Sequence, residues 1–74
     1  MKYIVETPEN KKAIPYFWQK DSEHDTVESA QARATELTGF ADPYTEPGVG
    51  LYKGYFGNPA KEVDGWDARI VVEN

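Results

Sequence analysis

One segment of the chain has a clear helical repeat, and it restricts the fold more than any other feature. Its apolar residues form a single narrow stripe at helical spacing, made up of Val27, Ala30, Ala34 and Leu37. Gly39 follows at the position where a left-handed residue commonly ends a helix. A stripe with two alanines in its middle allows a helix to approach a flat partner closely. The segment 26–38 therefore predicts one helix that packs on a sheet.

The residues before this helix carry a start signal. Asp25 and Glu28 have the spacing of a capping box, and Thr26 is an acceptable cap one residue later. We interpret Asp25 and Glu28 mainly as capping residues, because carboxylates are also favourable at the positive end of the helix dipole.

Four further segments have the alternation or the β-branched and aromatic residues typical of strands: 2–7, 13–19, 49–56 and Ala68–Glu73. Trp66 is expected to extend the last of them. Pro15 lacks an N–H group, so the second strand is expected at an edge of the sheet or beside a bulge. Residues 40–47 contain two X-Pro pairs and predict a loop. The order ββαββ predicts an α+β fold, with one helix packed on a four-stranded, mainly antiparallel sheet in a single domain, 1–74.

The chain length makes a well-packed core a strict requirement. A domain of 74 residues buries only about 60% of the surface that its unfolded chain exposes. The chain has no cysteine, so disulfides cannot compensate. Ten aromatic residues remain to supply the buried area, and most of them are expected in the core.

Acidic residues give the chain its most unusual surface property. Thirteen acids against eight bases leave a net charge of −5. Several of the acids lie just before the predicted helix and along it. Residues 21–25, which precede the helix, predict a solvated loop. A charged surface for solubility is one explanation. A partner-binding surface is the other, and its candidate residues are Asp21, Glu23, Glu28, Glu36, Asp42, Tyr44 and Glu46.

Catalytic and metal-binding patterns are weak in this chain. His24 lies between Asp21 and Asp25, which could imitate a base with an orienting carboxylate or a metal site. No glycine-framed nucleophile accompanies it, and one histidine with flexible acids makes a poor metal site. We predict no enzymatic activity, no metal and no cofactor.

The same composition bears on location and nucleic acids. No stretch has the apolar length of a signal peptide core or of a membrane span, which predicts no membrane association. The absence of cysteine favours a cytoplasmic protein. An acidic surface repels phosphate, so direct nucleic-acid binding is not expected.

In layout and charge the chain resembles the small acidic anti-CRISPR inhibitors that phages direct against bacterial CRISPR–Cas complexes. The resemblance covers Lys2-Tyr3-Ile4-Val5-Glu6, the helix 26–38, Gly50-Leu51-Tyr52-Lys53-Gly54-Tyr55-Phe56 and Ala68–Glu73. These proteins share no sequence motif, so the resemblance assigns no residue. It implies a phage protein in the host-cell cytoplasm that mimics DNA in charge and blocks a CRISPR effector.

Two functions are compatible with these observations. The first is a non-enzymatic, monomeric inhibitor that occupies a basic groove of a nucleic-acid-handling protein. The alternative is a protein–protein interaction module that uses a sheet edge or an aromatic patch around Tyr52, Tyr55 and Phe56, and such a module could also form a homodimer.

Overall fold

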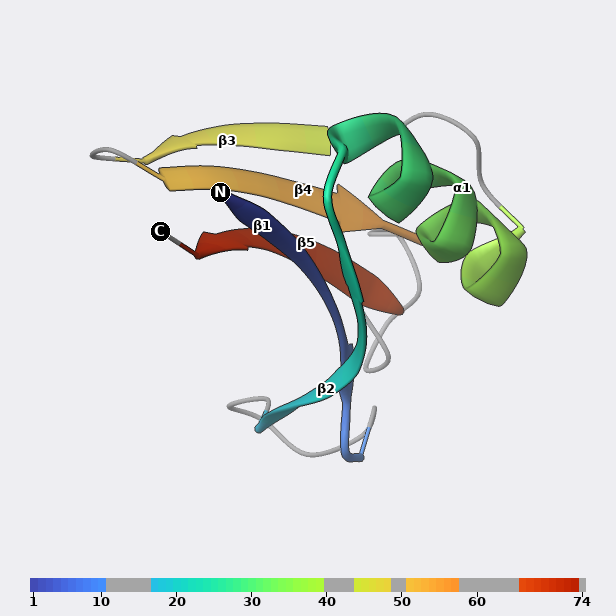
Figure 1. Cartoon of the computed structure of the whole chain (residues 1–74). Coiled ribbons are helices and arrows are strands. Elements are labelled where there is room, and N and C mark those ends of the chain that lie inside the picture. Colours follow the sequence, from blue (N-terminus) through green and yellow to red (C-terminus); the bar gives the residue numbers. More distant parts are fainter. Residues whose placement is uncertain (11–16, 40–43, 49–50, 58–65, 74) are drawn as a thin grey trace.

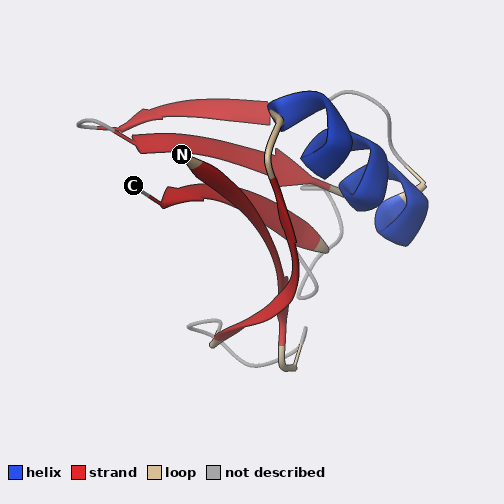
Figure 2. Ribbon diagram, viewed as in Figure 1, coloured by secondary structure: helices blue, strands red, loops and turns tan. Residues whose placement is uncertain are grey.

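The protein forms one sheet with a helix on one of its faces (Figures 1 and 2). The computed structural model describes residues 1–10, 17–39, 44–48, 51–57 and 66–73, and at 44–48 and 51–53 this description covers the backbone. In chain order the elements are β1 (Lys2–Pro8), β2 (Trp18–His24), α1 (Val27–Thr38), β3 (Tyr44–Gly48), β4 (Leu51–Phe56) and β5 (Ala68–Glu73).

The sheet is antiparallel throughout and has the strand order β2-β1-β5-β4-β3. The C-terminal strand β5 lies in the centre, where it pairs with β1 on one side and β4 on the other. β5 therefore joins an N-terminal pair of strands to a C-terminal pair. The predicted α+β class, with one helix packed on an antiparallel sheet, is confirmed.

The sheet differs from the sequence prediction at two strands. β2 begins at Trp18 and runs to His24, whereas the strand was expected at 13–19, and residues 13–16 lie outside the described part. The acidic residues up to His24 are thus in an edge strand and not in a loop. A fifth strand, β3, begins within the predicted loop 40–47 and ends one residue beyond it. Its Pro47 is compatible with an edge position, because an edge strand has N–H groups that need no partner.

The helix begins and ends with local hydrogen bonds that the sequence largely predicted. The Thr26 side chain accepts a hydrogen bond of 3.2 Å from the Ser29 N–H group, so Thr26 is the N-cap in preference to Asp25. At the other end Gly39 is left-handed, with φ 79°, and its N–H group donates to the Thr35 carbonyl at 2.7 Å.

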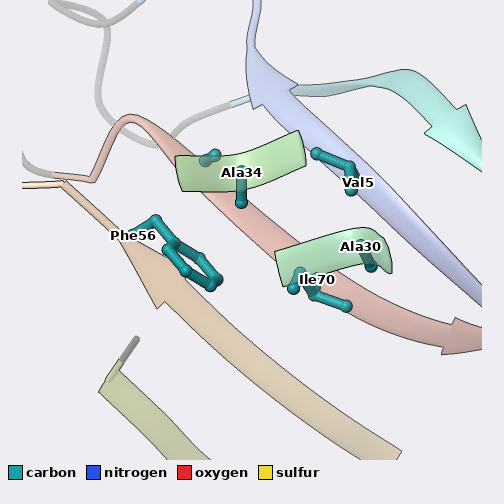
Figure 3. Close-up of a cluster of buried hydrophobic side chains, with 6 residues drawn as sticks. Val5, Ala30, Ala34, Phe56 and Ile70 are labelled. Carbon is teal, nitrogen blue, oxygen red and sulfur yellow. The ribbon is translucent and has the colours of Figure 1, made fainter. Parts of the chain in front are cut away.

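The core lies between α1 and the three central strands (Figure 3). Its fully buried residues are Val5, Ala30, Ala34, Phe56, Ala68 and Ile70. The two alanines bring the helix close to the sheet, as their place in the apolar stripe predicted. The ends of the stripe are less covered, since Val27 is half-buried and Leu37 remains 39% exposed.

The described residues include no helix with the length and apolar character needed to cross a membrane.

Candidate functional site

Strand register divides the surface into two faces of different chemistry. Val5, Ile70 and Phe56 point toward α1, so the residues that alternate with them lie on the side that α1 does not cover. We call this side the open sheet face. Its described residues are Lys2, Ile4, Glu6, Pro8, Trp18, Lys20, Glu23, Tyr55, Arg69, Val71 and Glu73. Ile4 and Pro8 are nevertheless buried, so this face is not exposed over its whole area.

A β-bulge in β2 decides where Asp21 lies. Val5 pairs with Ser22 and Glu6 pairs with Lys20, which leaves Asp21 as the extra residue of the edge strand. A bulge redirects the side chain of its extra residue. Lys20 consequently stays on the open sheet face, while Asp21 reaches the helix.

Asp21 and Arg33 form the best-defined ion pair of the helix side. The Arg33 Nε and Nη2 atoms donate to the two Asp21 carboxylate oxygens at 2.7 Å and 3.1 Å. Nη1 of the same guanidinium donates to Glu36 Oε1 at 3.1 Å. The hydrogen bonds that Arg33 donates lower the pKa of Asp21 from its ordinary value of 3.8, and the acceptance of these bonds by the Asp21 carboxylate raises the pKa of Arg33. This fork geometry holds β2 against α1.

Replacing Asp21 by asparagine is expected to lower the melting temperature at pH 7 and to matter progressively less in acid. With its pKa lowered in the folded state, Asp21 stabilises the fold above its ordinary pKa of 3.8, and this contribution is lost as pH falls through the folded pKa. Thermal unfolding of both proteins between pH 7 and pH 2 measures the difference. Glu9→Gln is the control, because Glu9 is exposed and has no base partner within the described part. A difference that does not change with pH would contradict the ion pair.

Glu23 lies on the opposite side of the molecule from α1. It pairs with Lys2 at 3.4 Å and also with Lys20, and the hydrogen bond from Lys20 is the main cause of its lowered pKa. Two lysines around one carboxylate leave no excess negative charge there. Glu23 is therefore close to the other acids in the sequence but lies on a different surface of the protein.

Every lysine and arginine side chain that the structure describes is paired with a carboxylate. The surface around α1 is nevertheless negatively charged, because its acids outnumber its bases. Glu36 is 73% exposed despite its contact with Arg33. Asp25 and Glu28 are exposed, and no ion pair to them occurs in the described residues. Four acids and one base make up this region, which we call the acidic helix surface: Asp21, Asp25, Glu28, Glu36 and Arg33.

The other candidate residues are placed less completely. Asp42 lies outside the described residues. Tyr44 and Glu46 belong to the edge strand β3, where their backbones lie opposite Tyr55 and Lys53 of β4. The structure thus joins Asp21 and Glu36 through Arg33, leaves Glu28 exposed on the same helix, and assigns Glu23 to the other face.

The open sheet face contains contacts that the sequence did not reveal. The Arg69 guanidinium carbon lies 4.5 Å from the centroid of the Trp18 ring, and Arg69 Nε donates to Glu6 Oε1 at 2.7 Å. The Tyr55 and Trp66 rings pack with their centroids 5.5 Å apart and tilted by 40°. The alternation within Ala68–Glu73, which sets Arg69 apart from the buried Ile70, was the available signal.

His24 joins β2 to α1 through hydroxyl groups. Ser22 Oγ lies 2.7 Å from its Nε2 atom, and Ser29 Oγ lies 2.8 Å from its Nδ1 atom. A serine beside an imidazole is a nucleophile–base arrangement, but the orienting group of such relays is a carboxylate, and here it is a second serine. Among the described residues, no three His, Cys, Asp or Glu side chains are grouped as a metal site would require.

Comparison of the chain with protein-family models, with curated proteins and with solved structures gave no match.

Proposed function

We propose that this protein is a non-enzymatic inhibitor that binds a basic surface of a nucleic-acid-handling protein, such as a CRISPR effector, through the acidic helix surface. The observation that supports this proposal is the segregation of charge. Glu28 and Glu36 are exposed on a helix that is capped at both ends and contains one basic residue, Arg33. The other described bases are Lys2, Lys20 and Arg69, all on the open sheet face.

The physical basis of the proposal is competition for a positively charged groove. Duplex DNA presents one negative charge for about every 1.7 Å of its axis, so a groove that binds DNA attracts any rigid anionic surface. Such attraction raises the association rate and weakens with salt. Asp21 contributes less than its charge suggests, because its carboxylate is already held by Arg33 and is 20% exposed.

The double substitution Glu28→Gln/Glu36→Gln is expected to weaken partner binding about tenfold at low salt. The partner is obtained by affinity capture from bacterial lysate at about 50 mM salt, and its affinity for each variant is then measured by titration. Both positions are exposed, so the melting temperature is expected to stay close to that of the unmodified protein.

Glu23→Gln/Glu73→Gln is the matched control, because it removes two negative charges from the open sheet face. If net charge alone attracts the partner, both double variants lose the same affinity. Equal losses, or binding that does not weaken between about 50 and 300 mM salt, would contradict a role for the acidic helix surface.

A further inference from the structure

A row of side chains crosses the open sheet face. Tyr55 lies opposite Arg69, Arg69 lies opposite Glu6, and Glu6 lies opposite Lys20. Trp18 contacts Arg69 from the end of β2, and Trp66 packs on Tyr55 from beyond the sheet. Trp, Tyr and Arg are the residues that most often carry the binding energy of protein interfaces.

The open sheet face is balanced in charge although the chain as a whole is strongly acidic. Among the residues whose side chains are described, its bases Lys2, Lys20 and Arg69 equal in number its acids Glu6, Glu23 and Glu73, whereas the whole chain has a net charge of −5. Two copies of an acidic chain repel each other on approach through most orientations. On this face the positive and negative charges are balanced. In a two-fold symmetric dimer the bases of one copy could therefore lie opposite the acids of the other.

The two edges of the sheet are poorly suited to accept a further strand. β2 is interrupted by the bulge at Asp21 and carries charged side chains on both sides of it. β3 contains Pro47, which has no N–H group to donate. Bulges, charges and proline are the features by which edge strands avoid pairing with another chain. Association of two copies is therefore expected through a face and not through an edge.

We propose that the open sheet face packs against the same face of a second copy in a symmetric dimer. Five strands about 4.8 Å apart, with about six residues of 3.3 Å each, span roughly 24 by 20 Å. This footprint, about 480 Å², is below the roughly 800 Å² per partner of a stable interface. The dimer is accordingly weak, with half-association at about 10–100 µM, and it strengthens with salt because screening reduces the repulsion between two chains of charge −5.

Sedimentation equilibrium of the full chain tests the proposal. Between about 5 and 500 µM the apparent mass is expected to rise from 8.4 kDa toward twice that value, with a tighter dimer at about 500 mM than at 50 mM salt. Val71→Lys places a charge at the centre of the face on the central strand and is expected to weaken dimerisation at least tenfold. Ala32→Lys adds the same charge at an exposed position of α1 and is expected to leave the dimer intact.

A second pair of variants keeps the test valid if Val71→Lys lowers the melting temperature. Glu23→Lys makes the open sheet face positive at an exposed position, while Glu28→Lys makes the same charge change on the acidic helix surface. We expect Glu23→Lys alone to weaken the dimer at low salt. A constant mass of 8.4 kDa at all concentrations, or equal dimerisation of both members of each pair, would overturn the proposal.

The outcome is separable from that of the proposed function. Glu28→Gln/Glu36→Gln changes the acidic helix surface and is expected to dimerise normally. Salt has opposite effects on the two equilibria, because it strengthens the dimer and weakens binding to a basic partner.

Discussion

Replacing Phe56 by alanine is expected to lower the free energy of unfolding by about 3–5 kcal/mol. The Phe56 side chain is fully buried between the sheet and α1 (Figure 3). Because Ala30 and Ala34 already bring α1 close to the sheet, the helix cannot move inward to fill the cavity that the substitution leaves. A domain of 74 residues typically has about 4–11 kcal/mol of total stability, so one substitution removes much of it. Urea and thermal unfolding followed by circular dichroism measure the loss.

The neighbouring substitution Tyr55→Ala provides the matched control. Tyr55 is half-buried on the open sheet face, and its described ring contact is with Trp66. We expect a loss of about 1–2 kcal/mol, the range for an aromatic pair with partial burial. Equal losses at the two positions would mean that Tyr55 also belongs to the core, and the division of the surface into two faces would then fail.

The elements that a local pattern encodes were predictable from the sequence. The stripe of α1 repeats at helical spacing and ends at Gly39, and the helix was found within one residue of its predicted start. The last strand was predicted as Ala68–Glu73, the range that it has, because its buried residues alternate with more exposed ones. The expected extension to Trp66 is wrong, since Trp66 lies before the strand. In both cases the residues that bury the element are close together in the sequence.

The strand β2 was misplaced because its stability comes from partners far away in the chain. Its residues from Gln19 to His24 are polar, so no apolar alternation marks them as a strand. They pair with β1, and Asp21 and His24 bond to α1 through Arg33 and Ser29. Contacts of this kind depend on the bulge, which a single sequence does not indicate.

The candidate site was predictable in composition but not in grouping. Glu28 and Glu36 share an exposed helix side, as helical spacing requires. Glu23, two residues after Asp21, lies on the opposite face with Lys2 and Lys20. Strand alternation and the bulge at Asp21 place these acids on different faces. Acids that are close together in the sequence therefore do not form an equally dense cluster on the surface.

Replacing Gly57 by alanine is expected to cost about 2–4 kcal/mol, although a single methyl group is added. Gly57 follows β4 with φ 120°, a conformation that residues with a side chain rarely adopt. A Cβ atom there would lie 2.8 Å from the Asp67 backbone nitrogen and 2.9 Å from Asp67 Oδ2. Relief of this clash would displace the Asp67 N–H group, which donates to the Phe56 carbonyl at 3.0 Å. Urea unfolding measures the cost.

Gly39→Ala separates backbone strain from crowding. Gly39 also has a positive φ, 79°, but a Cβ atom added there meets no atom within 4 Å. Strain alone then acts, and the expected cost is about 1 kcal/mol. If both alanines cost the same, crowding against Asp67 adds nothing to the backbone strain at Gly57. A larger cost at Gly57 is the expected result, because the chain there lies against Asp67, just before β5 enters the centre of the sheet, and has no room for a side chain. Because the nearest atom is a backbone nitrogen, truncating the Asp67 side chain is not expected to rescue Gly57→Ala.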